Sequence, residues 1–318
     1  MISAGAGIHL LYTRCIPSRD RPVRVPPSII TIQGEIQMAE KLTFDQFKEK
    51  IENTFMQHPV VVDNKYCQWF RDADLTKEEV AAFAVQFSVF SNLFLLACLN
   101  RVINAGNLES ARETKEILMN ELGVIYNNKK AAAPSAEMSD ADKDRDGDPA
   151  VVSTEGSVQG GTFRFQAAHF EWLLKFGAPV GLTFDDMGKR KHGTTETLHF
   201  CDELFRLFGA DDYNAAQGSS FAIENWAAAG FWKDLIAGLE NFKANKCPEI
   251  PLAFFTWHDK IEEQHKEHVW DELQEMFEEP EFNQEEFIRA GMEMLDGTQV
   301  FWDGLMKQRN EIAAKAQA

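Results

Sequence analysis

The chain has 318 residues, 44% of them hydrophobic and 11% aromatic, which is enough to bury a substantial core in one large domain or two small ones. Its 50 acidic residues outnumber its 32 Lys and Arg, and the net charge of −18 argues against nucleic-acid binding, because phosphate neutralisation needs clustered basic side chains. The five cysteines have no C-x-x-C spacing, which predicts reduced thiols and neither a disulfide framework nor a thiolate metal site: Cys15, Cys67, Cys98, Cys201 and Cys247.

Residues 1–37 differ in composition from the rest of the chain. They contain Arg14, Arg19, Arg21, Arg24 and four prolines, with only two acids. Met38 would be a natural start, so we expect 1–37 to be a leader or non-native start without order. An organelle-targeting signal is the alternative, although the prolines interrupt the amphipathic helix such signals need. We therefore expect one helical domain over 38–318 and a cytoplasmic protein, with organelle import through 1–37 left open.

Most of the remaining chain has the hydrophobic spacing of helices, and few segments alternate with the period of strands. The expected fold is a single all-α bundle. Thr43 and Thr76 are followed three residues later by Gln46 and Glu79, which is the spacing of a capping box, and Asn283 is a candidate cap for the last helix. The predicted helices cover residues 43–55, 77–105, 110–122, 165–176, 194–207, 221–242, 250–277 and 284–316.

No apolar run reaches the roughly 20 residues that span a bilayer. Residues 83–98 come nearest, but Gln86, Ser88, Ser91 and Asn92 interrupt them, so we expect a buried central helix and no membrane contact.

Residues 127–161 are rich in Ala, Asp, Ser and Gly and low in aromatic residues, so burial cannot offset the entropy of ordering them. We predict a long, mobile, acidic loop there, inserted between two helices. Within it, 142–148 matches the first half of an EF-hand calcium loop, but position 12 is Ser153 where a bidentate Glu is required. An ordinary acidic surface loop is the better explanation.

His258, Glu262 and His265 stand at i, i+4 and i+7. On a helix these residues fall within roughly 60° of one another along one face. Two imidazoles and a carboxylate directed at one point are ligands that a catalytic first-row metal prefers. A solvated charged face is the alternative for this pattern alone.

Two carboxylates stand where a helix should be apolar. Glu224 shares a predicted face with Phe221, Ala228, Phe231 and Leu235. A carboxylate buried there costs several kcal/mol unless it is paired or bound to a metal.

Glu121 follows Ile117 and Leu118 at helical spacings, and His169 precedes Trp172 and Phe176 in the same way. Singly, each has an ordinary explanation, either a core histidine bonded to a carbonyl or a carboxylate paired with Arg or Lys. Together with Glu224 and the H-x-x-x-E-x-x-H stretch they make three carboxylates and three imidazoles from four predicted helices.

This ordered set resembles the haem-oxygenase-like diiron oxidases and oxygenases, which are related in fold to the TenA thiaminases and pyrroloquinoline quinone synthesis protein C. The resemblance covers residues 75–270 and departs from the family twice, in the long segment 124–166 before His169 and in Glu262 where the family usually has Asp. It implies a bundle of the haem-oxygenase-like type and six metal ligands: Glu121, His169, Glu224, His258, Glu262 and His265.

The resemblance also implies two Fe per chain, with Mn as an option, and oxidation of a small organic substrate by O2. The reaction classes are N-oxygenation, oxidative C–C cleavage and decarboxylation. An external electron donor and a homodimer are further options. Candidate walls of the substrate pocket, each also explained as plain core, are Trp172, Phe176, Trp226, Phe231 and Trp257.

Two alternatives remain at this point. A ferritin-like centre would use the E-x-x-H pairs Glu196/His199 and Glu262/His265 with Glu121 and Glu224. A metal-free protein of the same fold would be a ligand-binding protein or a TenA-like hydrolase. The hydrolase needs a cysteine nucleophile beside an acid, for which Cys201 next to Asp202 is the only arrangement, and adjacent helical residues point about 100° apart.

Overall fold

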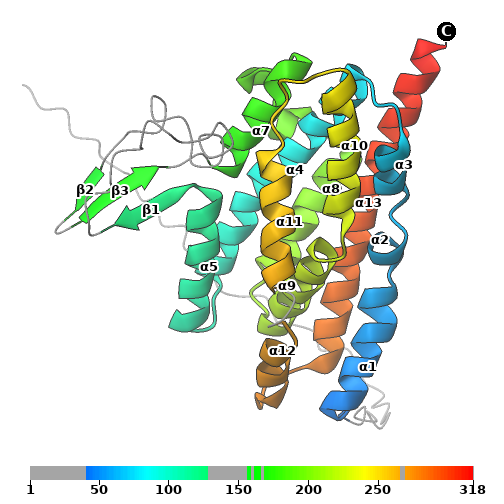
Figure 1. The fold of residues 1–318 in the computed structure, drawn as a ribbon. Coiled ribbons are helices and arrows are strands. Elements are labelled where there is room, and N and C mark those ends of the chain that lie inside the picture. The colour runs from blue at the N-terminus through cyan, green and yellow to red at the C-terminus, as the bar shows by residue number, and fades with distance from the viewer. Residues whose placement is uncertain (1–40, 128–155, 159–160, 166–167, 266–268, 318) are drawn as a thin grey trace, which may run out of the picture. The chain divides into compact units, whose positions relative to one another are not determined.

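The computed structural model describes the backbone of residues 41–127, 156–158, 161–165, 168–265 and 269–317. The predicted leader 1–37 lies outside these residues, as do 128–155 of the predicted loop with its EF-hand-like stretch. Residues Lys41–Ala318 form one compact unit, in which most described residues are helical (Figure 1). The prediction of a helical bundle is confirmed.

The α-helices are α1 (Phe44–Thr54), α2 (Pro59–Val62), α3 (Lys65–Asp72), α4 (Lys77–Ile103), α5 (Leu108–Glu121), α7 (His169–Gly177), α8 (Thr195–Glu203), α9 (Tyr213–Ala227), α10 (Phe231–Asn245), α11 (Ala253–His265), α12 (Val269–Glu278) and α13 (Gln284–Ala316). A π-helical turn, Leu204–Phe208, continues α8. Short 3-10 turns occur at Phe55–Gln57, Ala178–Val180, Phe184–Asp186 and Arg190–His192.

The predicted caps are present. The hydroxyls of Thr43 and Thr76 each accept the backbone N–H three residues on, and the Gln46 and Glu79 side chains accept the cap backbone N–H in return. Asn283 accepts two backbone N–H groups at the start of α13. These bonds satisfy donors that a helix start otherwise leaves unpaired, which is why α1, α4 and α13 begin where the sequence predicts.

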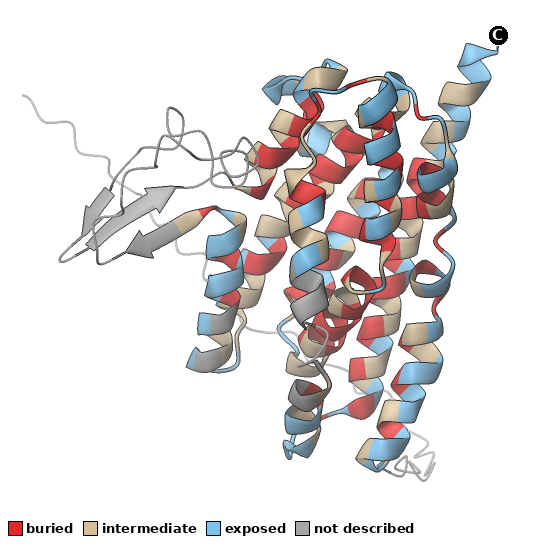
Figure 2. Ribbon diagram, in the orientation of Figure 1, coloured by how far each residue is buried: buried red, intermediate tan, exposed pale blue. Residues whose placement is uncertain are grey.

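α4 is the central helix and packs against α5, α7, α8 and α13. It is the one helix among the described residues that is long and apolar enough to cross a membrane, yet half of its apolar stretch is buried inside the protein. Phe83 and Phe87 on α4 join Phe301 and Trp302 of α13 in the aromatic core. Figure 2 shows buried residues, in red, recurring along the helices of the bundle. The apolar composition of α4 is therefore that of a core helix.

One predicted helix, 221–242, is two helices in the structure. α9 begins earlier, at Tyr213, and ends at Ala227, and α10 begins at Phe231 after Gly230 with φ of 95°. This left-handed conformation costs glycine little, so Gly230 allows the chain to turn. The predicted face that joined Glu224 to Phe231 and Leu235 is therefore wrong, because those residues belong to a different helix.

The structure adds a small sheet to the helical bundle. Strands β1 (Val124–Asn127), β2 (Gly156–Val158) and β3 (Gly161–Phe165) form an antiparallel sheet in the order β1-β3-β2. The prediction of a loop throughout 127–161 is thus wrong at its ends, as is the predicted helical start at residue 165. β-branched and aromatic residues in Val124-Ile125-Tyr126 and Thr162-Phe163 favour strands, a signal too short to stand out beside the helices.

α9 and α13 form the most extensive helix pair among the described residues. A Cβ added at Gly218 of α9 would overlap the backbone oxygen of Phe287 on α13. Since backbone cannot rotate aside as a side chain can, we expect Gly218→Ala to lower the free energy of unfolding by about 1–3 kcal/mol in urea denaturation. Gly106→Ala is the control, because a Cβ there meets nothing within 4 Å. Equal stability of the two variants would contradict the close approach of α9 and α13.

Candidate metal centre

Glu121 and His169 meet although 47 residues lie between them in the sequence. Glu121 is the last residue of α5 and His169 the first of α7. Between them, β1 pairs with β3 so that Val124 lies opposite Phe165, which brings the end of α5 to the start of α7. The Nδ1 atom of His169 lies 2.8 Å from Oε2 of Glu121, and both side chains are largely buried. The pairing of β1 with β3 thus brings together the two ends of segment 124–166, by which this chain departs from the family pattern.

His258 of α11 joins this pair. Its ring centroid lies 4.7 Å from that of His169, and the neighbouring Trp257 ring lies 4.9 Å from His169. The end of α5, the start of α7 and the middle of α11 therefore bring Glu121, His169 and His258 close together.

The surroundings of His258 determine its tautomer. Its Nδ1 lies 2.6 Å from the carbonyl oxygen of Phe254, and since a carbonyl can only accept, Nδ1 carries the proton. Burial lowers the pKa of His258 well below its usual value, and the charge of His169 lowers it further. His258 is therefore neutral at pH 7, with its lone pair on Nε2. A neutral imidazole whose other nitrogen is bonded to a carbonyl is the form that binds metals.

Tryptophans enclose both imidazoles. The Trp232 ring stacks on His258 at 4.9 Å and 25°, and the Trp172 ring on His169 at 5.7 Å and 28°. Flat contacts of this kind restrict rotation of the imidazoles. Next to this group, burial and the charge of Glu121 raise the pKa of the Cys98 thiol to about 12, which keeps it protonated.

The five residues proposed as walls of a substrate pocket fall into two groups, one beside the candidate centre and one in the core. Trp172 and Trp257 contact each other and His169, at 5.6 Å between their own ring centroids. Phe176 packs on Phe255, while Trp226 and Phe231 stack on each other at 4.5 Å in the core. Only Trp172 and Trp257 contact an imidazole of the candidate centre through these ring pairs.

Glu224 lies on α9 and is only partly exposed. Its Oε1 accepts a hydrogen bond from the Ser220 hydroxyl at 3.1 Å, one turn earlier on the same helix. α9 contacts α11, the helix of His258. That Glu224 is a metal ligand stays a prediction.

Glu262 and His265 lie on the backbone of α11, one and two turns after His258, so the helical premise of the motif holds. Their side chains lie outside the described part of the structure. Among the side chains that are described, no group of three or more His, Cys, Asp or Glu could by itself hold a metal ion.

The described donors fit a metal in their chemistry. Glu121, His169 and His258 provide one carboxylate and two imidazoles, and His258 presents a lone pair on Nε2. This mixed set suits Fe(II) or Mn(II) better than Ca²⁺ or Mg²⁺, which prefer oxygen ligands alone. Completing it requires the predicted ligands Glu224, Glu262 and His265.

The ferritin-like alternative is not supported by the positions of its residues. Glu196 is 2.9 Å from the ammonium of Lys307, and this hydrogen bond lowers the pKa of the Glu196 carboxyl. His199 is exposed. Because His199 is exposed and Glu196 is paired with a lysine, this E-x-x-H pair does not form a metal site in the bundle interior.

The cysteine nucleophile of the hydrolase alternative is also unsupported. Burial raises the pKa of the Cys201 thiol to about 12, and the carboxylate of the neighbouring Asp202 binds Arg190 at 2.6 Å. Burial likewise raises the pKa of Cys67 and Cys247. These thiols lack the thiolate character that nucleophilic catalysis requires.

Comparison with known proteins gives the fold. No protein-family model and no curated protein sequence matches the chain. A domain of unknown function with a heme oxygenase-like fold from Shewanella denitrificans is similar at TM-score 0.52 and 15% identity, over 86% of this chain and 96% of that one. A TenA homologue from Pseudomonas syringae pv. tomato is similar at TM-score 0.52 and 13% identity, over 82% and 92%.

A CADD-like protein of unknown function from Nostoc punctiforme is similar at TM-score 0.51 and 16% identity, over 83% of this chain and 95% of that one. At these identities the similarity concerns architecture and not activity. The helical arrangement that brings Glu121, His169 and His258 together is therefore the haem-oxygenase-like fold.

Proposed function

We propose that this chain is a non-haem diiron oxidase or oxygenase that uses O2 to oxidise a small organic molecule. The observation that supports the proposal most strongly is the meeting of Glu121, His169 and His258 from three helices, with a neutral His258 that presents Nε2. N-oxygenation, oxidative C–C cleavage and decarboxylation are the reaction classes that the family resemblance implies.

Six side chains would hold the metals: Glu121, His169, Glu224, His258, Glu262 and His265. Mixed imidazole and carboxylate ligation that leaves positions open suits Fe(II), with Mn(II) as the second choice. When bound, the iron would supply electrons to O2, and an external electron donor would restore them.

The chain's own residues perform the positioning. The carbonyl of Phe254 holds the Nδ1–H of His258, and Glu121 meets Nδ1 of His169, so each ring is fixed through the same nitrogen. Trp232 and Trp172 stack on the two rings and restrict their rotation.

The reaction with O2 tests this function. Protein loaded anaerobically with Fe(II) should consume O2 and change its optical spectrum when O2 is admitted, at a rate well above that of the same Fe(II) in buffer. Two results together would show that the protein lacks this function. They are a near-zero iron content of the protein after expression in iron-supplemented medium, and no spectral change when O2 is added to Fe(II)-treated protein.

A further inference from the structure

Tryptophan rings form a continuous series of contacts that leads away from the candidate metal centre. The rings of Trp257 and Trp232 each lie 4.9 Å from that of His258, measured between centroids. Phe231 lies 4.5 Å from Trp232 and 5.5 Å from Trp302, so a single ring links these two tryptophans. The series therefore runs from α11 through α10 to α13.

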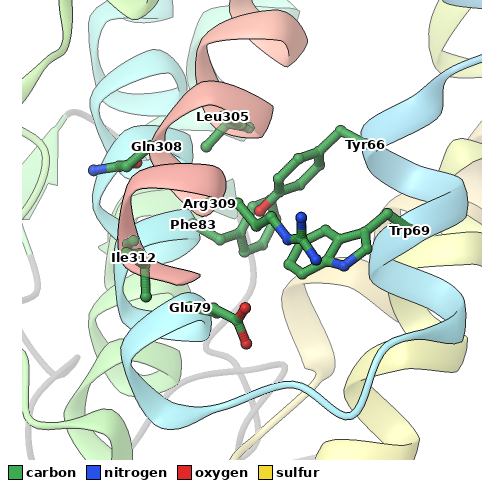
Figure 3. Close-up of a pocket in the computed structure, with 9 residues that line it drawn as sticks. Tyr66, Trp69, Glu79, Phe83, Leu305, Gln308, Arg309 and Ile312 are labelled. Carbon is green, nitrogen blue, oxygen red and sulfur yellow. The ribbon is translucent and has the colours of Figure 1, made fainter. Parts of the chain in front are cut away.

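The series ends at Tyr66 and Trp69 of α3. The Tyr66 ring lies 5.6 Å from that of Trp302 and 5.3 Å from that of Trp69. Tyr66 is buried, whereas Trp69 is partly exposed. Figure 3 shows the Tyr66 hydroxyl directed into the narrow space that Arg309 and the Glu79 carboxylate also line. The ring contacts thus connect the buried imidazoles with a ring that soluble molecules can reach.

Trp232 and Trp302 are costly as plain core residues. Both are buried, and among the described residues neither indole N–H has a hydrogen-bond partner. A buried donor without an acceptor costs roughly 1–3 kcal/mol, a cost that phenylalanine would avoid. An indole, however, loses an electron far more readily than the ring of phenylalanine. Without an acceptor for its proton, the oxidised indole keeps that proton, so the missing electron can be passed on to the next ring.

Tyr66 is a better resting place for a missing electron than Trp69. The Arg309 guanidinium lies 4.7 Å over the Trp69 ring and opposes a positive charge there. Burial raises the pKa of the Tyr66 phenol well above its usual value, so the phenol is protonated at pH 7. On losing an electron a phenol becomes strongly acidic, and after losing its proton it is a neutral radical that Arg309 does not repel.

Glu79 is positioned to take this proton. Its charge acts on the Tyr66 phenol, and its carboxylate lines the same narrow space. Oε2 of Glu79 accepts the backbone N–H and the hydroxyl of Thr76, both at 2.9 Å, and these cap bonds do not use Oε1. Glu79 therefore has an oxygen free of the cap bonds for the phenol proton.

We infer that Trp232, Trp302 and Tyr66 form a path along which the candidate centre exchanges single electrons with a soluble reductant at the protein surface. The proposed oxidation needs electrons from an external donor, and this path carries them through the bundle. It also removes an oxidising equivalent that meets no substrate before it damages the ligands. The inference rests on the proposed function for the source of that oxidising equivalent, whereas the path itself can be tested on protein without metal.

The transfers balance in electrons and protons. Tyr66 gives one electron to oxidised Trp302 and its phenol proton to Glu79. A soluble one-electron reductant such as ascorbate then gives an electron through the partly exposed Trp69, and Glu79 returns the proton to Tyr66. The net change is one electron moved from the reductant to the candidate centre, with every side chain restored.

Light-driven oxidation of the metal-free full chain tests the path. A ruthenium photosensitiser is attached to a Thr256→Cys variant, because Thr256 is exposed and precedes Trp257. The background carries Cys15→Ser, and the remaining thiols are buried and do not compete for the label: Cys67, Cys98, Cys201 and Cys247. After a flash, an added electron acceptor leaves the sensitiser one electron short, and the sensitiser then takes an electron from the protein. We expect a tyrosyl radical in the freeze-quenched electron paramagnetic resonance spectrum.

Single substitutions locate the radical and its path. Tyr66→Phe should remove the tyrosyl signal while keeping the ring that packs on Trp302. Trp302→Phe should lower the yield of the signal, because it interrupts the path in the middle. Trp270→Phe is the matched control and should leave the yield unchanged, since Trp270 packs on Phe221 in another group of rings. Ascorbate should erase the signal, and Trp69→Phe should slow that reaction. Circular dichroism shows whether each variant is folded.

Three results would each overturn the inference. They are the lack of a tyrosyl radical in the labelled protein, an unchanged radical yield in folded Tyr66→Phe or Trp302→Phe, and unchanged reduction by ascorbate in Trp69→Phe. Because no metal is present, such a result concerns the path alone. Failure of the diiron function would instead be seen as absence of Fe(II) binding and O2 consumption.

Discussion

His258→Ala is expected to lower the affinity for Fe(II) by at least about 100-fold. Loss of a residue that only hydrogen-bonds to a metal ligand typically lowers metal affinity about 10–100-fold, and this variant removes a proposed ligand itself. The effect follows from the tautomer of His258, which presents Nε2 while Nδ1–H is held by Phe254. Anaerobic Fe(II) titration of the folded variant measures it. His169→Ala should behave alike, because His169 is bonded to Glu121 and packed against His258.

His199→Ala is the matched control for His258→Ala. His199 is a histidine of the same protein that is exposed on α8, so its loss should leave Fe(II) affinity within about twofold of the wild type. If His199→Ala or Glu196→Ala abolishes iron binding while His258→Ala retains it, the proposed ligand set is wrong and the ferritin-like set replaces it.

The second large effect concerns metal-dependent stability. We expect Fe(II) or Mn(II) to raise the melting temperature of the wild type, because a ligand that binds only the folded state stabilises it. Glu224→Ala should abolish this rise, since the family resemblance implies that both metals would use the Glu224 carboxylate. Glu262→Ala should keep part of the rise, because His258 and His265 remain on α11.

Melting curves of the three proteins with and without metal give the comparison. The difference between melting temperatures with and without metal, within each variant, separates metal binding from any direct effect of the substitution on folding. Retention of the full rise by Glu224→Ala would remove Glu224 from the ligand set.

Helix starts were predictable from sequence where the deciding interactions are local. Thr43 and Thr76 form capping boxes within four residues, and the apolar core of α4 follows from its own composition. The break between α9 and α10 was missed because the residues from Ala227 to Ala229 continue a helical pattern, and only Gly230 indicates the turn. α2 and α3 were missed because both are short, although Pro59 and Asn64 stand at favourable first-turn and cap positions.

The sequence pattern indicated candidate ligands, but not the pairing that brings two of them into contact. His258, Glu262 and His265 lie on one helix, so their spacing alone indicates a shared face. The contact between Glu121 and His169 depends on the pairing of β1 with β3, which the sequence pattern did not predict.

The stoichiometry of Fe(II) binding decides most directly whether this chain holds a diiron centre. Anaerobic titration of metal-free protein should saturate near two Fe(II) per chain if all six proposed ligands act, with Glu262 substituting for the usual Asp. The titration must use folded, full-length protein, and His258→Ala should abolish its high-affinity phase. Two equivalents in the wild type are the predicted result. Absence of saturable Fe(II) binding would rule out the proposed diiron centre.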